Sequence, residues 1–163
     1  MSVATDDKRF VLIAPLGRGG TAEVARVTVT DLRRQAALKF PLKDATTTPA
    51  EFAALARREY ELIGGQTFPG LVRLLEPPHV NPDYLLLELC EGPTLDTIGR
   101  IDDLPLAMRV LSAIALSMEY IRARGIVHGD MKPHNVFLPR DWEKFSQDRL
   151  WFAKISDFSL GRR

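Results

Sequence analysis

Residues 127–138 read VHGDMKPHNVFL, a group of polar side chains between two short apolar segments. Asp130 and Asn135 are five positions apart, and Lys132 stands between them. The apolar segments 126–127 and 136–138 predict brief strands, so we expect the polar residues on the loop that joins them.

The first half of the chain has the pattern of a sheet with one helix. Short or alternating apolar runs, bounded by glycine, proline and asparagine turns, predict strands. Gly17, Gly19 and Gly20 separate the first two runs, which predicts a hairpin closed by a glycine loop. The predicted strands are five in number and span residues 10–16, 24–30, 35–40, 71–75 and 84–89.

The helix of this half has a start signal with a physical cause. Thr48 can cap the helix, the proline that follows suits its first position, and Glu51 completes a capping box. The helix should end at residues 64–65, a glycine pair. Its apolar stripe holds Phe52, Leu55 and Ile63 but also Glu59, and a carboxylate on a buried stripe needs a cation as partner.

In the second half of the chain, the spacing of the apolar residues changes from that of strands to that of helices. A short helix is predicted over residues 95–100 and a long one from residue 104 to Gly125. Brief strands are predicted at residues 126–127, 136–138 and 152–155. The expected buried stripe of the long helix consists of Leu111, Ile114, Met118 and Ile121.

Composition excludes several classes of protein. The chain has 163 residues with 22 basic and 21 acidic side chains, a net charge of +1 that gives no reason to expect nucleic acid or a membrane surface as partner. The N-terminus lacks an apolar signal region and the apolar stretches are short or interrupted, so no membrane segment is expected. The single cysteine, Cys90, fits a reducing compartment, and we expect a cytoplasmic protein.

Five motifs, in a fixed order, resemble those of the eukaryotic-type protein kinases, and most closely the bacterial serine/threonine branch. Residues 17–24 resemble the glycine loop, residues 36–39 the V-A-I-K strand, and Glu59 the glutamate of the following helix. Residues 128–135 resemble H-R-D-x-x-x-x-N and residues 157–159 resemble D-F-G. The resemblance implies an α+β, protein-kinase-like fold. It has a five-stranded antiparallel N-lobe with one helix over residues 1–90, and an incomplete, mainly helical C-lobe over residues 91–163.

The resemblance also implies ATP and Mg²⁺ as cofactors and a protein serine or threonine as substrate. Asp130 would orient the substrate hydroxyl, Lys132 would neutralise the γ-phosphate, and the ion pair of Lys39 with Glu59 would hold the other phosphates. Asn135 and Asp157 would bind Mg²⁺. The nucleotide-binding residues implied in this way are Leu16, Gly17, Gly19, Gly20, Val24, Ala37, Lys39, Leu87, Glu88, Cys90, Asn135 and Asp157. Three histidines, His79, His128 and His134, have no metal-ligand spacing, and His128 is expected as a packed loop residue.

Ala22 replaces the third glycine of the glycine loop, and three further departures from the family pattern bear on the implied function. Gly129 stands where the family has arginine, which puts control through an activation-loop phosphate in doubt, and Ser159 replaces the glycine of D-F-G. The chain also stops at Arg163, so we expect it to cover only the first part of the domain. The long helix should then be partly uncovered, and we expect the isolated chain to be marginally stable or to self-associate.

Two other functions stay open. A kinase-like nucleotide-binding or scaffold module without activity would show nucleotide binding and no transfer. A small-molecule phosphotransferase of the aminoglycoside type also has H-G-D in its catalytic loop, but Lys132 and Pro133 after Asp130 argue against that class.

Overall fold

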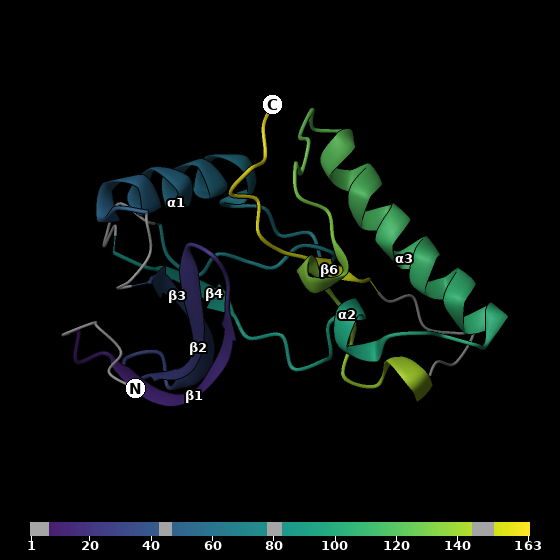
Figure 1. The fold of residues 1–163 in the computed structure, drawn as a ribbon, viewed down its shortest axis with the longest axis horizontal. Coiled ribbons are helices and arrows are strands. Elements are labelled where there is room, and N and C mark those ends of the chain that lie inside the picture. The colour runs from purple at the N-terminus through teal and green to yellow at the C-terminus, as the bar shows by residue number, and fades with distance from the viewer. Residues whose placement is uncertain (1–6, 43–46, 78–82, 145–151) are drawn as a thin grey trace. The chain divides into compact units, whose positions relative to one another are not determined.

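A computed structural model describes residues 7–42, 47–77, 83–144 and 152–163 (Figure 1). The chain divides into two compact units. The first unit consists of residues 1–64 and 73–89, and the second of residues 65–72 and 90–163.

The first unit is built on an antiparallel sheet with the strand order β1-β2-β3-β4. Its strands are β1 (Phe10–Arg18), β2 (Ala22–Val29), β3 (Arg34–Pro41) and β4 (Leu85–Glu88). The alternation predicted for β2 is confirmed, because Ala25, Val27 and Val29 are buried in one cluster with Leu38 of β3 and Leu86 of β4. Successive residues of a strand point to opposite faces, so the residues between Ala25, Val27 and Val29 lie on the other face of the sheet.

One strand of the predicted five is not formed. Residues 71–75 were expected to be a strand, but the sheet of the described residues has four. Leu74 makes an isolated bridge to Leu87, and both residues belong to the first unit. Leu71 makes an isolated bridge to Ile155, and both of these residues belong to the second unit. The short segment therefore changes its pairing partner along its length, and neither partner forms a continuous ladder with it.

Helix α1 (Pro49–Ile63) begins and ends where its signals predict. The Thr48 hydroxyl accepts a hydrogen bond from the Glu51 amide at 3.2 Å, and the Glu51 carboxylate accepts one from the Thr48 amide at 2.7 Å. The latter bond lowers the pKa of the Glu51 carboxyl. Phe52 and Ala56 of α1 pack against the sheet in a cluster with Ala22 and Leu85, which attaches the helix to one face of the sheet.

The second unit is mainly helical. It contains α2 (Leu95–Ile98) and α3 (Leu104–Arg122), with the 3₁₀ turns η1 (Pro133–Asn135) and η2 (Trp142–Lys144). Strands β5 (Val136–Phe137) and β6 (Lys154–Ile155) form a small antiparallel pair. Val127 makes a bridge with Arg162, so the start of the polar loop at 128–135 is tied to the C-terminal residues of the chain.

The predicted stripe of α3 is confirmed at Ile121, but Leu111 is exposed and Ile114 and Met118 are only half-buried. The buried residues are Val110, Ala113, Ser117 and Ile121, whereas Leu111 is 59% exposed. The buried face carries small residues because backbone lies close to it. The Ser117 hydroxyl donates to the Ala153 carbonyl at 2.7 Å, and a Cβ atom at Gly70 would lie 2.1 Å from the Ser117 hydroxyl oxygen.

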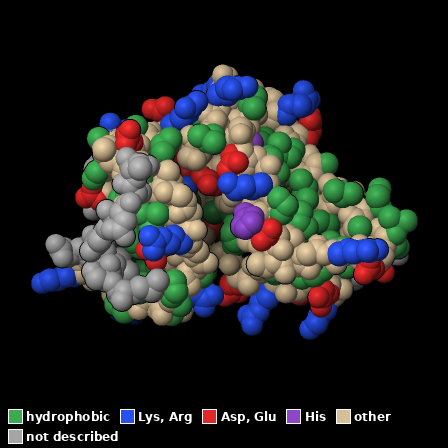
Figure 2. Space-filling view, in the orientation of Figure 1, with side chains coloured by type: hydrophobic (Ala, Val, Ile, Leu, Met, Phe, Trp, Pro, Cys, Tyr) green, Lys and Arg blue, Asp and Glu red, His purple; other side chains and the backbone are tan. Residues whose placement is uncertain are grey.

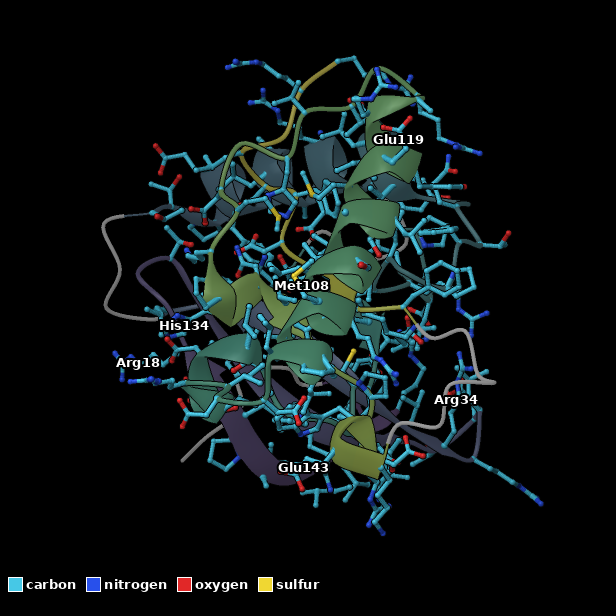
Figure 3. The ribbon with its side chains drawn as sticks, turned by 90° about the vertical axis from the view of Figure 1, so that its right-hand side faces the viewer. Arg18, Arg34, Met108, Glu119, His134 and Glu143 are labelled. Carbon is cyan, nitrogen blue, oxygen red and sulfur yellow. The ribbon has the colours of Figure 1, made fainter. Side chains whose placement is uncertain are left out.

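Large apolar side chains are instead exposed along α3 (Figures 2 and 3). They are Leu104, Met108, Leu111 and Leu116. Among the described residues, α3 is the one helix that is long and apolar enough to cross a membrane. Asp103 caps this helix by accepting a hydrogen bond from the Leu106 amide, and Ser117 is buried within the second unit. The expected self-association of the chain stays a prediction.

Candidate functional site

The first unit contains an ion pair between β3 and α1. The Nζ atom of Lys39 lies 3.4 Å from Oε2 of Glu59, and the two side chains are only 14% and 3% exposed. Leu38 is fully buried in the cluster that contains Ala25 and Leu86. The Lys39 side chain, one position further along β3, lies on the opposite face of the sheet. The pairing predicted from a carboxylate on a buried helix stripe is therefore confirmed.

The strand register places three residues that the sequence predicted to bind the nucleotide, Val24, Ala37 and Leu87, on the same face of the sheet as Lys39. Val24 is the register partner of Lys39, and Leu87 is the partner of Ala37. Since Ala37 and Lys39 are two positions apart on one strand, all four side chains lie on one face of the sheet. Glu88 follows at the end of β4, where its amide donates to the Arg73 carbonyl and its carboxylate accepts from the Arg73 amide.

The glycine loop joins β1 to β2. The Gly19 amide donates to the Ala22 carbonyl at 2.8 Å and closes the turn. A Cβ atom at Gly17 or Gly20 would meet no other atom within 4 Å, and neither residue has a positive φ. No packing within the described chain therefore requires glycine at positions 17 and 20. Leu16, before the loop, is 46% exposed.

The second unit brings together the polar residues of the 128–135 loop. Oδ2 of Asp130 accepts a hydrogen bond from Lys132 Nζ at 2.6 Å. The Asn135 side-chain amide donates to the Asp130 backbone carbonyl at 2.8 Å and lies 3.4 Å from Oδ2. The Asp130 carboxylate thus contacts a lysine and a carboxamide from its own loop.

His128 supports this loop from below its surface. It is 2% exposed, and its ring packs 4.4 Å from the ring of Phe158. The Asp130 amide donates to Nδ1 at 3.2 Å, so Nε2 carries the proton and donates to the Ser156 carbonyl at 2.9 Å. His128 is therefore the packed loop residue predicted from the sequence, and it connects the 128–135 loop to residues 156–158.

The next segment places Asp157 near Asn135 along the β5–β6 pair. The Ser156 amide donates to the Asn135 carbonyl at 3.0 Å, next to the pairing of Val136 with Ile155. Asp157 has a φ of +64°, and the Ser159 hydroxyl donates to its Oδ1 atom at 2.8 Å. The contact from Ser159 was missed in the sequence, where the only signal was a hydroxyl two residues after a carboxylate.

Asn135 and Asp157 offer a donor set that fits Mg²⁺. The amide nitrogen of Asn135 is directed to Asp130, which leaves the amide oxygen as the atom for a cation, and Asp157 supplies a carboxylate. Mg²⁺ prefers such hard oxygen donors and usually shares them with water and phosphate. In the described part of the chain, no group of three or more His, Cys, Asp or Glu side chains is placed to hold a metal ion.

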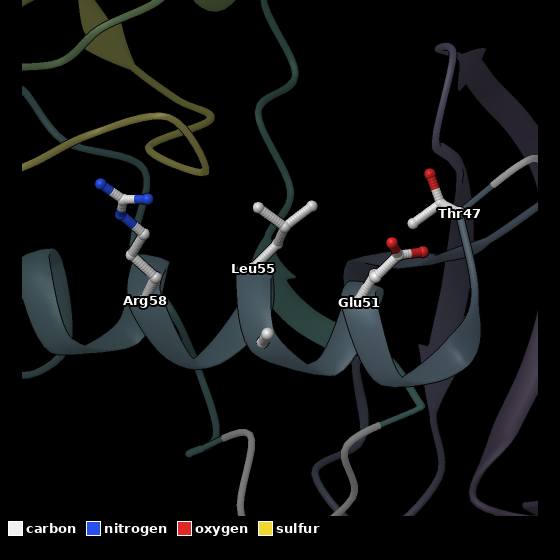
Figure 4. A pocket seen from close by; sticks show the side chains of 5 residues that line it. Thr47, Glu51, Leu55 and Arg58 are labelled. Atoms are coloured by element: carbon white, nitrogen blue, oxygen red, sulfur yellow. The ribbon is translucent and has the colours of Figure 1, made fainter.

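Two surface pockets lie outside these residues. One lies at α1 and is lined by four helix residues and by Thr47, which precedes the cap Thr48 (Figure 4). The helix residues are Glu51, Ala54, Leu55 and Arg58. The other lies between α2, the start of α3 and Pro133. Neither is lined by a residue that the sequence predicted to bind a nucleotide or metal.

Cys90, which the sequence predicted to contact the nucleotide, is half-buried in the second unit.

Comparison with known proteins identifies the family that this order of motifs and this geometry define. A family model described as the protein kinase domain matches residues 10–163, and the chain therefore belongs to the protein kinase family. A kinase domain implies the use of ATP.

Similar curated proteins are bacterial serine/threonine kinases. The chain is 32% identical over 162 residues to a probable serine/threonine-protein kinase of Streptomyces coelicolor, covering 94% of this chain and 23% of that protein. It is 30% identical to serine/threonine-protein kinase pkn2 of Myxococcus xanthus, covering 96% and 18% of the two chains. It is also 30% identical to the DNA damage-responsive serine/threonine-protein kinase RqkA of Deinococcus radiodurans, covering 93% and 22%. The chain thus spans about a fifth of the length of these relatives.

Proposed function

We propose that this chain is the nucleotide-binding and catalytic-loop part of a serine/threonine protein kinase, which transfers the γ-phosphate of ATP to a protein hydroxyl in the cytoplasm. The observation that carries the proposal is the grouping of Asp130, Lys132 and Asn135 on one loop. Phosphoryl transfer depends mainly on positioning and on charge stabilisation, and these side chains offer a proton acceptor, a cation and an oxygen ligand. Family membership supports the assignment.

In this proposal, Asp130 accepts and orients the proton of the substrate hydroxyl. The bond from Lys132 holds the carboxylate in place, and the lysine charge would stabilise the γ-phosphate in the transition state. Bound Mg²⁺ supplies charge neutralisation for the phosphates. Asn135 and Asp157 would hold it, since their oxygen donors fit that cation.

Lys39 would bind the α- and β-phosphates. Glu59 restrains the lysine side chain, because an ion pair of low exposure limits where the ammonium group can lie. Gly17, Gly19 and Gly20 would let backbone amides approach phosphate oxygens, and the open space around Gly17 and Gly20 supports this role. The adenine would pack on Val24, Ala37 and Leu87, with Leu16 beside it and the backbone of Glu88 and Cys90 as hydrogen-bonding partners.

A transfer assay with radiolabelled ATP tests the proposal. The native protein is incubated with Mg²⁺, ATP and a peptide library that contains serine and threonine, and the phosphorylated amino acids are separated. The proposal predicts phosphoserine or phosphothreonine, and loss of both in Asp130→Asn. Nucleotide binding without any transfer would instead favour the scaffold function, and phosphorylation of an aminoglycoside alone would favour a small-molecule phosphotransferase.

A further inference from the structure

Asp157 has an uncommon backbone conformation. Its φ of +64° lies in the left-handed region, and among the described residues Arg33 is the one other non-glycine residue with a positive φ. Such a conformation costs an L-residue free energy and persists where the surrounding structure imposes it. Here the neighbours on both sides are fixed, because the Ser156 carbonyl is bonded to His128 and Phe158 is fully buried.

The side chain of Asp157 is fixed by a different residue. The terminal torsion of an aspartate is broad and roughly two-fold, so the backbone alone does not set the plane of the carboxylate. The Ser159 hydroxyl donates to Oδ1 at 2.8 Å, a charge-assisted bond that restrains this plane. Glycine, the residue that the D-F-G pattern has at this position, could not make the bond.

We propose that Ser159 is a positioning residue for Mg²⁺: its hydroxyl orients the Asp157 carboxylate so that it presents an oxygen to the cation of Mg²⁺-ATP. The inference rests on the function proposed above. Residues that hydrogen-bond to a metal ligand commonly set its orientation and the metal affinity. The Ser159 hydroxyl therefore helps to preorganise the metal site, because it restrains the Asp157 carboxylate before Mg²⁺ binds.

The same segment contains a matched control. Ser156 is also a serine next to Asp157, but its hydroxyl donates to the backbone carbonyl of Asn135 at 3.4 Å rather than to a carboxylate. Removing it deletes one hydroxyl from the same loop and leaves the bond to Asp157 in place. A general loosening of the loop would affect both serine variants, whereas the positioning role concerns Ser159 alone.

The test measures ATP binding by calorimetry over a series of free Mg²⁺ concentrations and without Mg²⁺. Ser159→Ala should raise about tenfold the free Mg²⁺ concentration at which half of the Mg²⁺-dependent gain in ATP affinity is reached. Tenfold is the lower end of the loss in metal affinity that is typical when a residue supporting a metal ligand is removed. The ATP affinity without metal and the melting temperature should stay unchanged. Ser159→Thr, which keeps the hydroxyl, and Ser156→Ala should both stay within about twofold of the wild type. Ser159→Gly provides a second variant without the hydroxyl and should behave like Ser159→Ala.

The outcomes separate the two proposals. If both Ser159→Ala and Ser159→Gly keep the wild-type Mg²⁺ dependence while Asp157→Ala loses it, the role of Ser159 is refuted and the nucleotide site stands. A lower melting temperature without a shift in the Mg²⁺ midpoint also overturns the positioning role, because it shows a purely structural bond. If Asp157→Ala itself keeps the Mg²⁺ dependence, the proposed function fails together with the inference.

Discussion

A Cβ atom at position 129 would lie 2.4 Å from the carbonyl oxygen of Leu160. Gly129 also has a φ of +84°, so its backbone conformation and its surroundings both favour glycine. This explains in physical terms why the chain has no arginine in its H-G-D motif. The backbone of Leu160 occupies the space that a side chain at position 129 would need.

Gly129→Ala should therefore destabilise the fold by about 3 kcal/mol or more, since it combines left-handed strain with a clash. Gly125→Ala is the matched control. Gly125 has a φ of +71° but no atom within 4 Å of its Cβ position, so only the strain of about 1–2 kcal/mol is expected. Denaturant unfolding measures both values, and equal losses would show that Leu160 does not restrict position 129.

The ion pair of the first unit should contribute to stability through its burial. Glu59→Gln leaves the Lys39 ammonium with a neutral partner at a site that is 14% exposed, and we expect a loss of about 2–3 kcal/mol in the free energy of unfolding. The exposed pair of Arg122 with Glu119, at 2.6 Å, is the control. Glu119→Gln should leave the melting temperature unchanged because surface pairs contribute little. Equal effects of the two substitutions would contradict the account.

Alkaline pH should destabilise the first unit through Tyr84. Burial raises the pKa of Tyr84 to about 12 from the ordinary value of 10.0. The folded state therefore keeps the phenol protonated while the unfolded chain ionises, so this contribution is complete below pH 10 and is lost as the pH rises towards 12. The Tyr84 hydroxyl also contacts Arg9 and Asp7, and the bond from Arg9 lowers the pKa of the Asp7 carboxyl.

Tyr84→Phe should consequently reduce the loss of stability between pH 10 and pH 12, although it lowers stability at neutral pH by removing these contacts. Urea unfolding at several pH values gives the two curves, and Tyr60→Phe controls for the loss of a hydroxyl elsewhere in the unit. Parallel curves for Tyr84→Phe and wild type would refute the assignment of the alkaline effect to Tyr84.

The helix cap is a local prediction from sequence that can be tested alone. Thr48→Ala removes the bond from the Glu51 amide at 3.2 Å and should cost about 1 kcal/mol. Thr47→Ala, one residue earlier, removes no bond of the capping box and is the control. Thermal unfolding distinguishes them, and equal melting temperatures would show that the capping box does not stabilise α1.

The sequence predicted the features that depend on a few neighbouring residues, or on one buried charge that needs a partner. The capping box defined the start of α1, and Glu59 on a buried stripe required a cation, which Lys39 provides. The polar loop at 128–135 was found because its residues follow one another at the spacing of the family motif, and the structure adds that they contact one another within the loop.

The remaining features depend on chain segments far apart in sequence. The buried face of α3 is built around Ser117, whose partner Ala153 is 36 residues away, so apolar periodicity predicted only Ile121 among its buried residues. Residues 71–75 change their pairing partner between Leu71 and Leu74, which no periodicity can show. The restriction at Gly129 likewise comes from Leu160, a contact between two loops.

Titration calorimetry of Mg²⁺-ATP binding to the chain tests the assignment of the nucleotide site. We expect Mg²⁺-dependent binding to the wild type, and a loss of at least about tenfold in affinity in both Lys39→Ala and Asp157→Ala, equal to about 1.4 kcal/mol each. Arg122→Ala, from the exposed pair on α3, should bind as the wild type does. Wild-type affinity in both Lys39→Ala and Asp157→Ala would contradict the assignment of the nucleotide site.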